Sequence, residues 1–260
     1  MKIACTAWVL LAAASAAPAT RVERIYPSAD NIPSNALRMY LCFSAAMRPG
    51  GAFTHIHLLD EKGAEIRHAL LEEEVWDRDT ARLTVLFDPA RIKRGEASRL
   101  EPGPNLVEGH SYTLAIDRDW KDAAGENLAE GSRKSFHVVQ ADHVSLEPST
   151  WHITTPKPGT RDALLVDFPK PLDYALVLRS LSVKGVSGAA TLDRGETEWR
   201  FVPNSPWKSG DNRLWVDRGL EDVAGNRIYR PFESNTHGAI ATGDRPPAGT
   251  VEVRFHIDPQ

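Results

Sequence analysis

The chain has 260 residues, of which 42% are hydrophobic and 25% are charged, which is the composition of an ordinary soluble globular protein. This length fits one large domain or two domains of roughly 100 to 120 residues. The formal net charge of -4 argues against a nucleic-acid-binding protein, because such proteins carry an excess of basic side chains that bind phosphates.

The N-terminus has the pattern of a signal peptide. Lys2 supplies a positive charge, residues 3–14 form an apolar run, and Ala14-Ser15-Ala16 or Ala17-Pro18-Ala19 offers a cleavage site. We expect residues 1–19 to be removed and the mature protein to reach the periplasm or the extracellular medium. No other apolar stretch approaches the about 20 residues of a transmembrane helix, so we expect no transmembrane segment in the mature chain.

The first half of the mature chain contains short segments in which apolar and polar residues alternate. Residues 37–44 are the clearest case, because Leu37, Met39 and Phe43 all fall on one face, as in a half-buried strand. Residues 64–79 are ambiguous and fit either a helical turn or a short strand with an acidic edge. The other strands predicted in this half are residues 53–59, 83–87, 111–117 and 135–139.

A proline-rich segment, residues 147–160, leads to a second set of strands. No segment of the chain sustains a helical period over ten residues. Short strands separated by turns rich in Pro, Gly and Asp are typical of a β-sandwich, so we predict an all-β fold. The strands predicted in this half are residues 163–169, 198–203, 212–217 and 251–257.

One turn sequence occurs twice, with Leu, Asp-Arg, Asp, Ala and Gly recurring 100 residues apart in residues 114–127 and 214–226. Such recurrence indicates an internal repeat. The Asp three residues before the Gly in each copy is expected to accept backbone hydrogen bonds within the turn, and the Gly is expected to adopt a positive φ. The residues with this structural role are Asp122 and Gly125 in the first copy and Asp222 and Gly225 in the second.

Further motifs accompany the two turns in the same order. The first copy contains Phe43-Ser44 with Met47, Phe87-Asp88-Pro89 and Gly109-His110-Ser111-Tyr112, and the second contains Phe168 and Phe201-Val202-Pro203. In this order both copies resemble the Ig-like domain of bacterial cell-envelope proteins, the type first described in S-layer proteins. The resemblance implies two tandem Ig-like β-sandwich domains, at residues 20–142 and 161–260, with a linker and lead-in at residues 143–160. Because such domains serve as spacers, adhesin segments and enzyme appendages, the resemblance implies a fold without an activity.

His55 and His57 are the candidate metal ligands. If residues 53–59 form a strand, both imidazoles project from the face opposite Ile56, about 7 Å apart at the rise of a strand. Such a pair can chelate copper or zinc, and the soft thioether of Met47 would favour copper. Two exposed histidines on a strand also occur without any metal, and this alternative stays open.

A Ca²⁺ site in the first repeated turn is less favoured. The hard oxygen ligands are present, but Arg118 and Lys121 intervene and the central Gly of an EF-type loop is missing. The carboxylates that such a site would use are Asp117, Asp119, Asp122 and Glu126.

Aromatic and basic residues form a possible interaction surface. Trp76, Trp120 and Trp207 lie in or next to predicted turns, where exposed rings stack on sugars or anchor a protein partner. The same rings could instead cover a junction between the two domains. The run Arg91-Ile92-Lys93-Arg94 is the only basic cluster, and it fits either this surface or a solvated loop.

Motifs for catalysis are missing from the sequence. It contains no G-x-S-x-G, no H-E-x-x-H, no P-loop and no Rossmann glycine pattern. The adjacent carboxylates of Glu72, Glu73 and Glu74 cannot face each other across a cleft as in a glycosidase. We therefore expect a protein that is not an enzyme.

The predicted function is that of an exported cell-envelope protein, a binding or structural module for an envelope protein or polysaccharide. The alternative is a periplasmic copper- or zinc-binding protein that uses His55 and His57. A hydrolase accessory domain is a third, less favoured interpretation.

Overall fold

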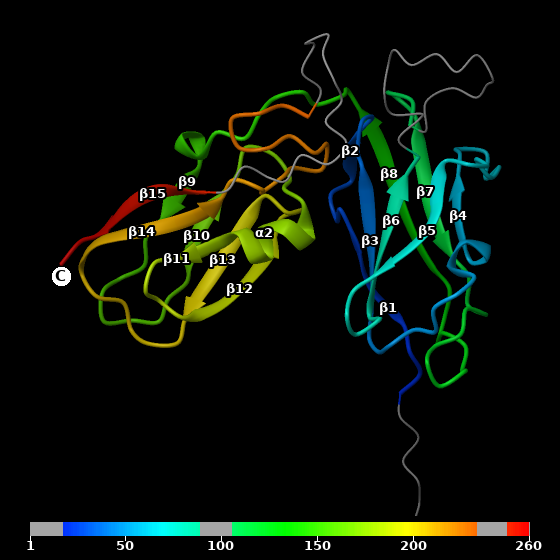
Figure 1. The fold of residues 1–260 in the computed structure, drawn as a ribbon, viewed down its shortest axis with the longest axis horizontal. Helices are drawn as coiled ribbons and strands as arrows, with labels where there is room; N and C mark the ends of the chain where they lie inside the picture. Colours follow the sequence, from blue (N-terminus) through cyan, green and yellow to red (C-terminus); the bar gives the residue numbers. More distant parts are fainter. Residues whose placement is uncertain (1–17, 89–105, 233–248, 260) are drawn as a thin grey trace, which may run out of the picture.

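The structure, a computed structural model, describes residues 18–88, 106–232 and 249–259. Strands account for most of its regular structure, and they form two sandwiches that lie side by side in Figure 1. The predicted all-β sandwich fold is confirmed. Most of the predicted signal peptide and the basic residues Arg91, Lys93 and Arg94 lie outside the described residues. No helix within the described ranges has the length and apolar character needed to cross a membrane.

Two four-stranded sheets form the first sandwich, and neighbouring strands are antiparallel except for the parallel pair β2 and β8. One sheet has the order β1 (Val22–Tyr26), β3 (Arg38–Phe43), β6 (Arg82–Phe87) and β5 (Leu70–Trp76). The other has the order β2 (Asn31–Pro33), β8 (Ser132–Val139), β7 (Ser111–Ile116) and β4 (Ile56–Leu59).

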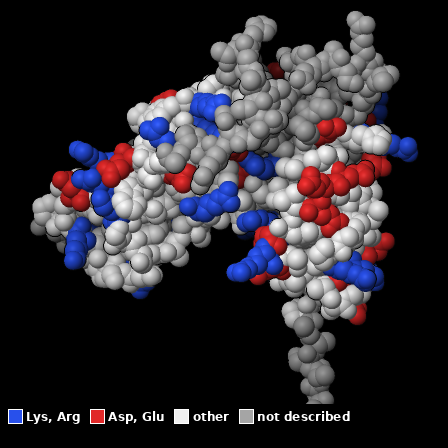
Figure 2. Space-filling view, viewed as in Figure 1, with Lys and Arg blue, Asp and Glu red and all other residues white. Residues whose placement is uncertain are grey.

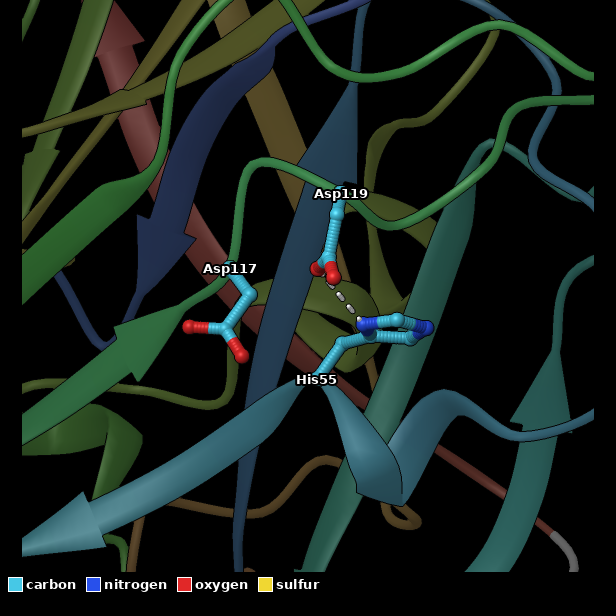
Figure 3. A group of neighbouring side chains, drawn as sticks. All are labelled: His55, Asp117 and Asp119. Carbon is cyan, nitrogen blue, oxygen red and sulfur yellow. Dashed lines mark hydrogen bonds and ion pairs between the residues drawn. The ribbon is translucent and has the colours of Figure 1, made fainter.

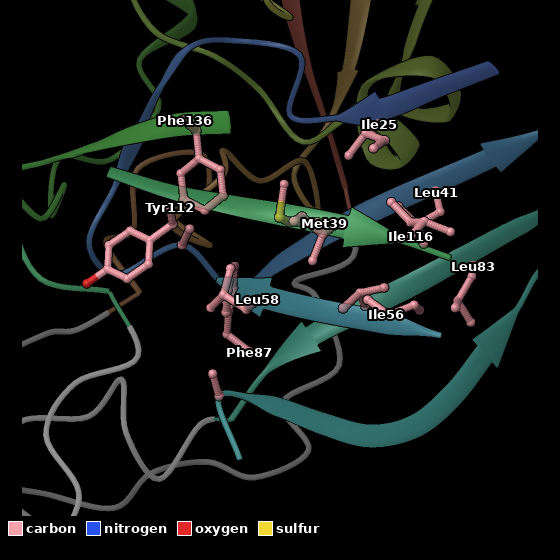
Figure 4. Packing of buried hydrophobic residues seen from close by; sticks show 14 of the residues in the cluster. Ile25, Met39, Leu41, Ile56, Leu58, Leu83, Phe87, Tyr112, Ile116 and Phe136 are labelled. Carbon is pink, nitrogen blue, oxygen red and sulfur yellow. The ribbon is translucent and has the colours of Figure 1, made fainter. Parts of the chain in front are cut away.

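The inner faces of these sheets enclose one hydrophobic core, part of which is shown in Figure 4. Met39 and Leu41 point inward from β3, and Leu58 and Leu114 point inward from β4 and β7 of the facing sheet. None of the four is more than 1% exposed. Burial of each such side chain contributes about 1.5–3 kcal/mol. This core holds the sandwich without a disulfide, since Cys42 is a free thiol.

The second sandwich has two antiparallel sheets and its own core around Trp199 and Leu214, both 0% exposed. One sheet has the order β12 (Gly188–Asp193), β13 (Glu198–Pro203), β10 (Leu164–Asp167) and β9 (His152–Thr154). The other has the order β11 (Leu181–Val183), β14 (Gly210–Asp217) and β15 (Thr250–Ile257).

A short helix, α2 (Tyr174–Ser180), lies on the side of the second sandwich that faces the first (Figure 1). Its N-cap is Asp173, whose carboxylate accepts the backbone N–H of Leu176 at 2.9 Å. This is a standard way to satisfy a free N–H at the start of a helix. The helix spans only about two turns, so it shows no helical period of the length that the sequence analysis required.

The predicted strand at residues 53–59 is half correct. A 3-10 helix, η1 (Ala52–Thr54), replaces its first part, and β4 begins only at Ile56. Gly51 starts this helix with a φ of 81°, a backbone conformation that favours glycine. The predicted linker also contains structure, namely η2 (Pro148–Thr150) and the strand β9.

The repeated turn has the same hydrogen bonds in both copies. In the first, Oδ1 of Asp122 accepts the N–H groups of Ala124 at 2.9 Å and Glu126 at 3.0 Å. In the second, Oδ1 of Asp222 accepts the corresponding N–H groups of Ala224 and Asn226, both at 2.9 Å. The glycines that follow, Gly125 and Gly225, have φ values of 85° and 82°. The turns differ in their surroundings, because residues 123–125 are exposed whereas residues 223–225 are buried against the first sandwich.

Replacing each of the two turn glycines, Gly125 and Gly225, with alanine should distinguish the cost of backbone strain from the cost of steric clashes with neighbouring side chains. Gly125→Ala should lower the free energy of unfolding by about 1 kcal/mol, because only the positive φ opposes it and no atom lies within 4 Å of the new Cβ. Gly225→Ala should lower it by about 1 kcal/mol more, because its Cβ would clash with a methyl group of Leu37 and approach the ring of Phe232. Urea unfolding of both variants measures the difference, and equal losses would show that the packing around Gly225 relaxes freely.

The ambiguous residues 64–79 contain the edge strand β5, so the strand alternative was the correct one. Its register is interrupted between Leu71 and Val75, where Glu72 and Glu73 are exposed. Figure 2 shows Asp and Glu side chains gathered over β5. Charges and irregularity on an edge strand hinder pairing with another chain.

Glu74 of β5 has a separate structural role. Its carboxylate accepts the backbone N–H groups of Gly50 and Ala52 and the indole N–H of Trp76, each at 2.8 Å. Burial alone would raise the pKa of Glu74, but the bonds from Gly50, Trp76 and Ala52 together hold this pKa below its ordinary value. Glu74 therefore stabilises, through these hydrogen bonds, the loop that leads into η1.

Glu74→Gln is expected to lower the free energy of unfolding by about 1 kcal/mol at pH 7, since the charged acceptor is lost. Because the folded-state pKa of Glu74 is depressed, its contribution is present above the unfolded pKa of about 4.3 and disappears as the pH falls through the folded value. Urea unfolding at pH 7 and at pH 3 should show a larger difference between wild type and variant at pH 7 than at pH 3. Glu73→Gln, at an exposed neighbour, serves as the control and should change little at either pH.

Candidate functional site

His55 occupies a defined position at the boundary between η1 and β4. It is the C-cap of the 3-10 helix, and its backbone N–H donates to the carbonyl of Ala52 at 3.0 Å. Its imidazole stacks on the indole of Trp120, with 5.9 Å between the ring centroids and 14° between the planes. Trp120 is only 2% exposed. A buried ring thus orients an imidazole that remains 24% exposed.

Two carboxylates from the loop after β7 lie beside this imidazole (Figure 3). Asp119 points toward His55, and 3.1 Å separates its Oδ1 from Nδ1 of the ring. Asp117 is fixed from the backbone, because its N–H donates to the carbonyl of His55 at 2.9 Å. One ligand atom from each of the three side chains lies within 4.8 Å of the others. Among the described residues this is the group with the arrangement of a candidate metal centre.

His57 is not one of these three side chains, but it forms a hydrogen bond with one of them, Asp117. Its Nδ1 lies 2.8 Å from Oε1 of Glu65, and its Nε2 lies 3.0 Å from Oδ2 of Asp117. The hydrogen bond with Glu65 raises the pKa of His57 above its ordinary value, and Asp117 adds to this shift. With both nitrogens on carboxylates, His57 orients Asp117 and offers no free lone pair.

The predicted set of His55, His57 and Met47 is not brought together. Met47 is 0% exposed within the first core, so its thioether cannot reach either imidazole from the surface. The two histidines do not share a strand face, because η1 ends at Thr54 and only His57 lies in β4. Of the carboxylates considered for Ca²⁺, Asp122 is also occupied, since it holds the repeated turn and accepts the hydroxyl of Thr20 at 2.8 Å.

The predicted aromatic surface is wrong for two of its three rings. Trp120 is 2% exposed and packs edge-to-face on Phe43, and Trp207 is 4% exposed in the second core. Trp76 is partly buried against the first core, with its indole N–H bound to Glu74. Trp120 and Trp207 thus belong to the two hydrophobic cores, and Trp76 packs against the first. They provide no platform for sugar rings.

The two sandwiches meet in a polar contact, here called the domain junction, which the sequence analysis did not detect. Arg38 of β3 forms an ion pair with Asp173, with 2.8 Å between Nε and Oδ2, and a second ion pair with Glu221. The hydroxyl of Tyr40 lies 2.8 Å from both carboxylate oxygens of Asp173. Asp173 is 3% and Glu221 is 8% exposed. Both carboxylates are therefore buried and neutralised across the junction.

Apolar contacts complete the domain junction. The rings of Tyr26 and Tyr174 stack with 3.6 Å between centroids and 9° between planes. Val223, from the second copy of the repeated turn, is buried within the core of the first sandwich. Its carbonyl accepts the backbone N–H of Leu37 at 3.1 Å. The second turn thus serves as the docking element between the domains.

A cleft of about 690 Å³ runs along the domain junction. Its two lining cations are both engaged, since Lys170 pairs with Asp142 at 2.9 Å and Arg194 pairs with Asp167 at 3.1 Å. Asp222 also contacts Lys170, but burial raises the pKa of Asp222 more than this cation lowers it. The cleft therefore offers no unpaired cation among its described lining residues.

No protein-family model matches the sequence, and no curated relative matches it. Among solved structures, the S-layer protein rSbsC(31-844) is similar over 76% of this chain and 23% of its own, at 12% sequence identity and a TM-score of 0.32. Domains 1–6 of the surface layer protein SbsC match 93% of this chain and 41% of theirs, at 8% identity and a TM-score of 0.32.

A third similar structure is native alpha-2-macroglobulin from Escherichia coli, spanning domains MG0-NIE-MG1. It matches 94% of this chain and 73% of its own, at 10% identity and a TM-score of 0.32. This chain spans less than a quarter of the S-layer protein rSbsC(31-844). With identities of at most 12% and TM-scores of 0.32, all three are remote similarities.

Proposed function

We propose that the protein is an exported, non-enzymatic module of the cell envelope in which two Ig-like sandwiches act as one rigid unit. The domain junction is the observation that carries this proposal. Two buried carboxylates, Asp173 and Glu221, are neutralised there by Arg38 of the other sandwich. Separation of the domains would break the ion pairs of Arg38 with both carboxylates. It would also expose the stacked rings of Tyr26 and Tyr174 and the side chain of Val223 to water, which is unfavourable. A fixed angle between the domains follows, and such a unit is suited to spacing or presenting other envelope components.

The N-terminal sequence supplies the cellular context of the proposal. A charged residue, an apolar run and small residues before position 20 have the order of a signal peptide. The proposed partner is an envelope protein or a polysaccharide, and the proposed location is the periplasm or the cell surface. Domains 20–142 and 161–260, with the segment 143–160 between them, are the proposed units.

Fractionation of the native cells tests this proposal. The protein is expected in the periplasmic or surface fraction with a mass that corresponds to removal of about 16 to 19 N-terminal residues, as signal-peptide cleavage predicts. It should also sediment with isolated, protein-free envelope polysaccharide, or crosslink to one envelope protein. An unprocessed protein in the cytoplasmic fraction would contradict the proposal.

A copper- or zinc-binding protein is the second candidate function. It cannot use Met47, which is buried, and His57 is engaged with Glu65 and Asp117. Of the three predicted metal ligands, only His55 remains available. It lies beside Asp117 and Asp119, which are not part of the His-x-His pattern.

A further inference from the structure

We propose that the first sandwich binds one divalent transition-metal ion of the zinc class through His55, Asp117 and Asp119. This inference goes beyond the structural role proposed above and does not depend on it. The three side chains come from two elements, the η1–β4 boundary and the loop after β7. Their potential ligand atoms lie within 4.8 Å of one another.

The separations are close to those of a coordinated ion. With metal–ligand bonds of about 2.0–2.1 Å, the ligand atoms of a tetrahedral zinc site lie about 3.4 Å apart. Nδ1 of His55 and Oδ1 of Asp119 are already 3.1 Å apart. A side-chain movement of about 1–1.5 Å brings all three atoms to the tetrahedral separation, and the Asp119 side chain is 75% exposed and free to make it.

The surroundings hold the ligands in place. His55 is stacked on the buried ring of Trp120, and its carbonyl accepts the N–H of Asp117 at 2.9 Å. Asp117 is in turn hydrogen-bonded by His57, which is itself bound to Glu65. Hydrogen-bonded partners of this kind orient metal ligands and are a regular part of metal sites.

The donor set selects the class of metal. An imidazole nitrogen with two carboxylates suits zinc and its neighbours, whereas Ca²⁺ and Mg²⁺ prefer oxygen ligands alone. Three protein ligands leave a fourth position for water or for a group from a partner. Binding through Nδ1 of His55 requires that nitrogen to carry no proton, since a ligating imidazole must be neutral.

The second sandwich contains a matched control. Nδ1 of His256 lies 2.7 Å from Oδ1 of Asp211, so an exposed histidine–aspartate pair exists there too. His256 also lies 3.9 Å from Asp258, but among the described residues these three side chains do not place one ligand atom each within 4.8 Å of the others. A variant at His256 therefore removes an ordinary surface pair and leaves the proposed site intact.

Zn²⁺ titration of the purified, untagged protein against a chromophoric chelator tests the proposal. We expect one equivalent to bind, with the affinity reduced more than about 100-fold in His55→Ala and in Asp119→Asn. His57→Gln should reduce the affinity by about 10- to 100-fold, as for other hydrogen-bonded partners of ligands. His256→Ala should leave it unchanged, and excess Ca²⁺ should not displace Zn²⁺. Circular dichroism shows whether each variant remains folded, and Asp119→Asn changes only an exposed side chain.

Fluorescence gives an independent reading. Cu²⁺ bound beside His55 should quench the emission of Trp120. The fraction of tryptophan emission that is quenched should therefore be smaller in Trp120→Phe. In Asp119→Asn, one equivalent of Cu²⁺ should cause no quenching. Zinc affinity that stays unchanged in both ligand variants, or that falls equally in His256→Ala, would overturn the proposal. Either result leaves the envelope role unaffected, because that role is tested by location and partner.

Discussion

Replacing Arg38 with alanine is expected to lower the free energy of unfolding by about 3 kcal/mol or more. The change leaves Asp173, which is 3% exposed, without its cation and removes one of the two cations of Glu221. Removal of one partner from a buried ion pair costs about 3–5 kcal/mol, because the remaining charge stays poorly solvated. Here the cost falls toward the lower end, since Arg227 still pairs with Glu221 and Tyr40 still bonds to Asp173.

Urea unfolding followed by circular dichroism measures this loss, and Arg213→Ala is the control. Arg213 pairs with Glu252 at 2.9 Å, but both side chains are more than a third exposed. Such surface pairs contribute about 0–1 kcal/mol. We also expect Arg38→Ala to unfold in two transitions, one for each sandwich. Similar losses in the two variants, or an unchanged transition in Arg38→Ala, would show that the domain junction does not couple the domains.

Replacing Trp120 with alanine should destabilise the first sandwich by about 3–5 kcal/mol. Its ring is 2% exposed and packs edge-to-face on Phe43, with 5.3 Å between the centroids, and against Trp76. Truncation of a buried tryptophan removes this contact area and leaves a cavity that the surrounding structure fills only in part. The loss should appear in the unfolding of the first sandwich.

The matched control is Trp215→Ala in the second sandwich. Trp215 is 36% exposed, and its indole bonds to Glu252 at 3.1 Å. Its removal should lower stability by about 1 kcal/mol or less, in line with other surface positions. Thermal unfolding of both variants, monitored by circular dichroism, distinguishes these outcomes. If the two replacements are equally mild, Trp120 does not support the first core.

Strand positions could be predicted where one face of a strand is buried. Residues 198–203 match β13 in both of its bounds, and residues 251–257 match β15 to within one residue. In these segments the period of two is imposed by the core itself, so the pattern is visible in the sequence. The short elements η1, α2 and β9 were missed, because three to seven residues are too few to show a period.

The candidate metal centre could be predicted only in part. His55 and the two aspartates were each noticed, but in separate hypotheses. Their proximity depends on the antiparallel pairing of β4 with β7, in which Ile56 lies opposite Ile116. No local pattern specifies which strands pair, and the sequence did not reveal the 3-10 helix that ends just before His55.

The domain junction was beyond prediction for the same reason. Arg38 lies within the alternating segment at residues 37–44, and its partners Asp173 and Glu221 lie far along the chain. The N-cap role of Asp173 has a sequence signal, since an Asp precedes an apolar run there. That signal explains the start of α2, but it does not reveal that the same carboxylate also binds the other domain.

The position of Val223 has a consequence for how the molecule can be assembled and taken apart. The side chain lies in the core of the first sandwich, although it follows the proline-rich segment and most of the second sandwich in the sequence. As the chain is synthesised from its N-terminus, the first core therefore stays incomplete until the chain has passed this residue. By the same token, a protease that cuts the segment between the domains would leave the two halves associated. The linker divides the chain at residues 143–160, but the core of the first sandwich also includes Val223, which comes after the linker in the sequence.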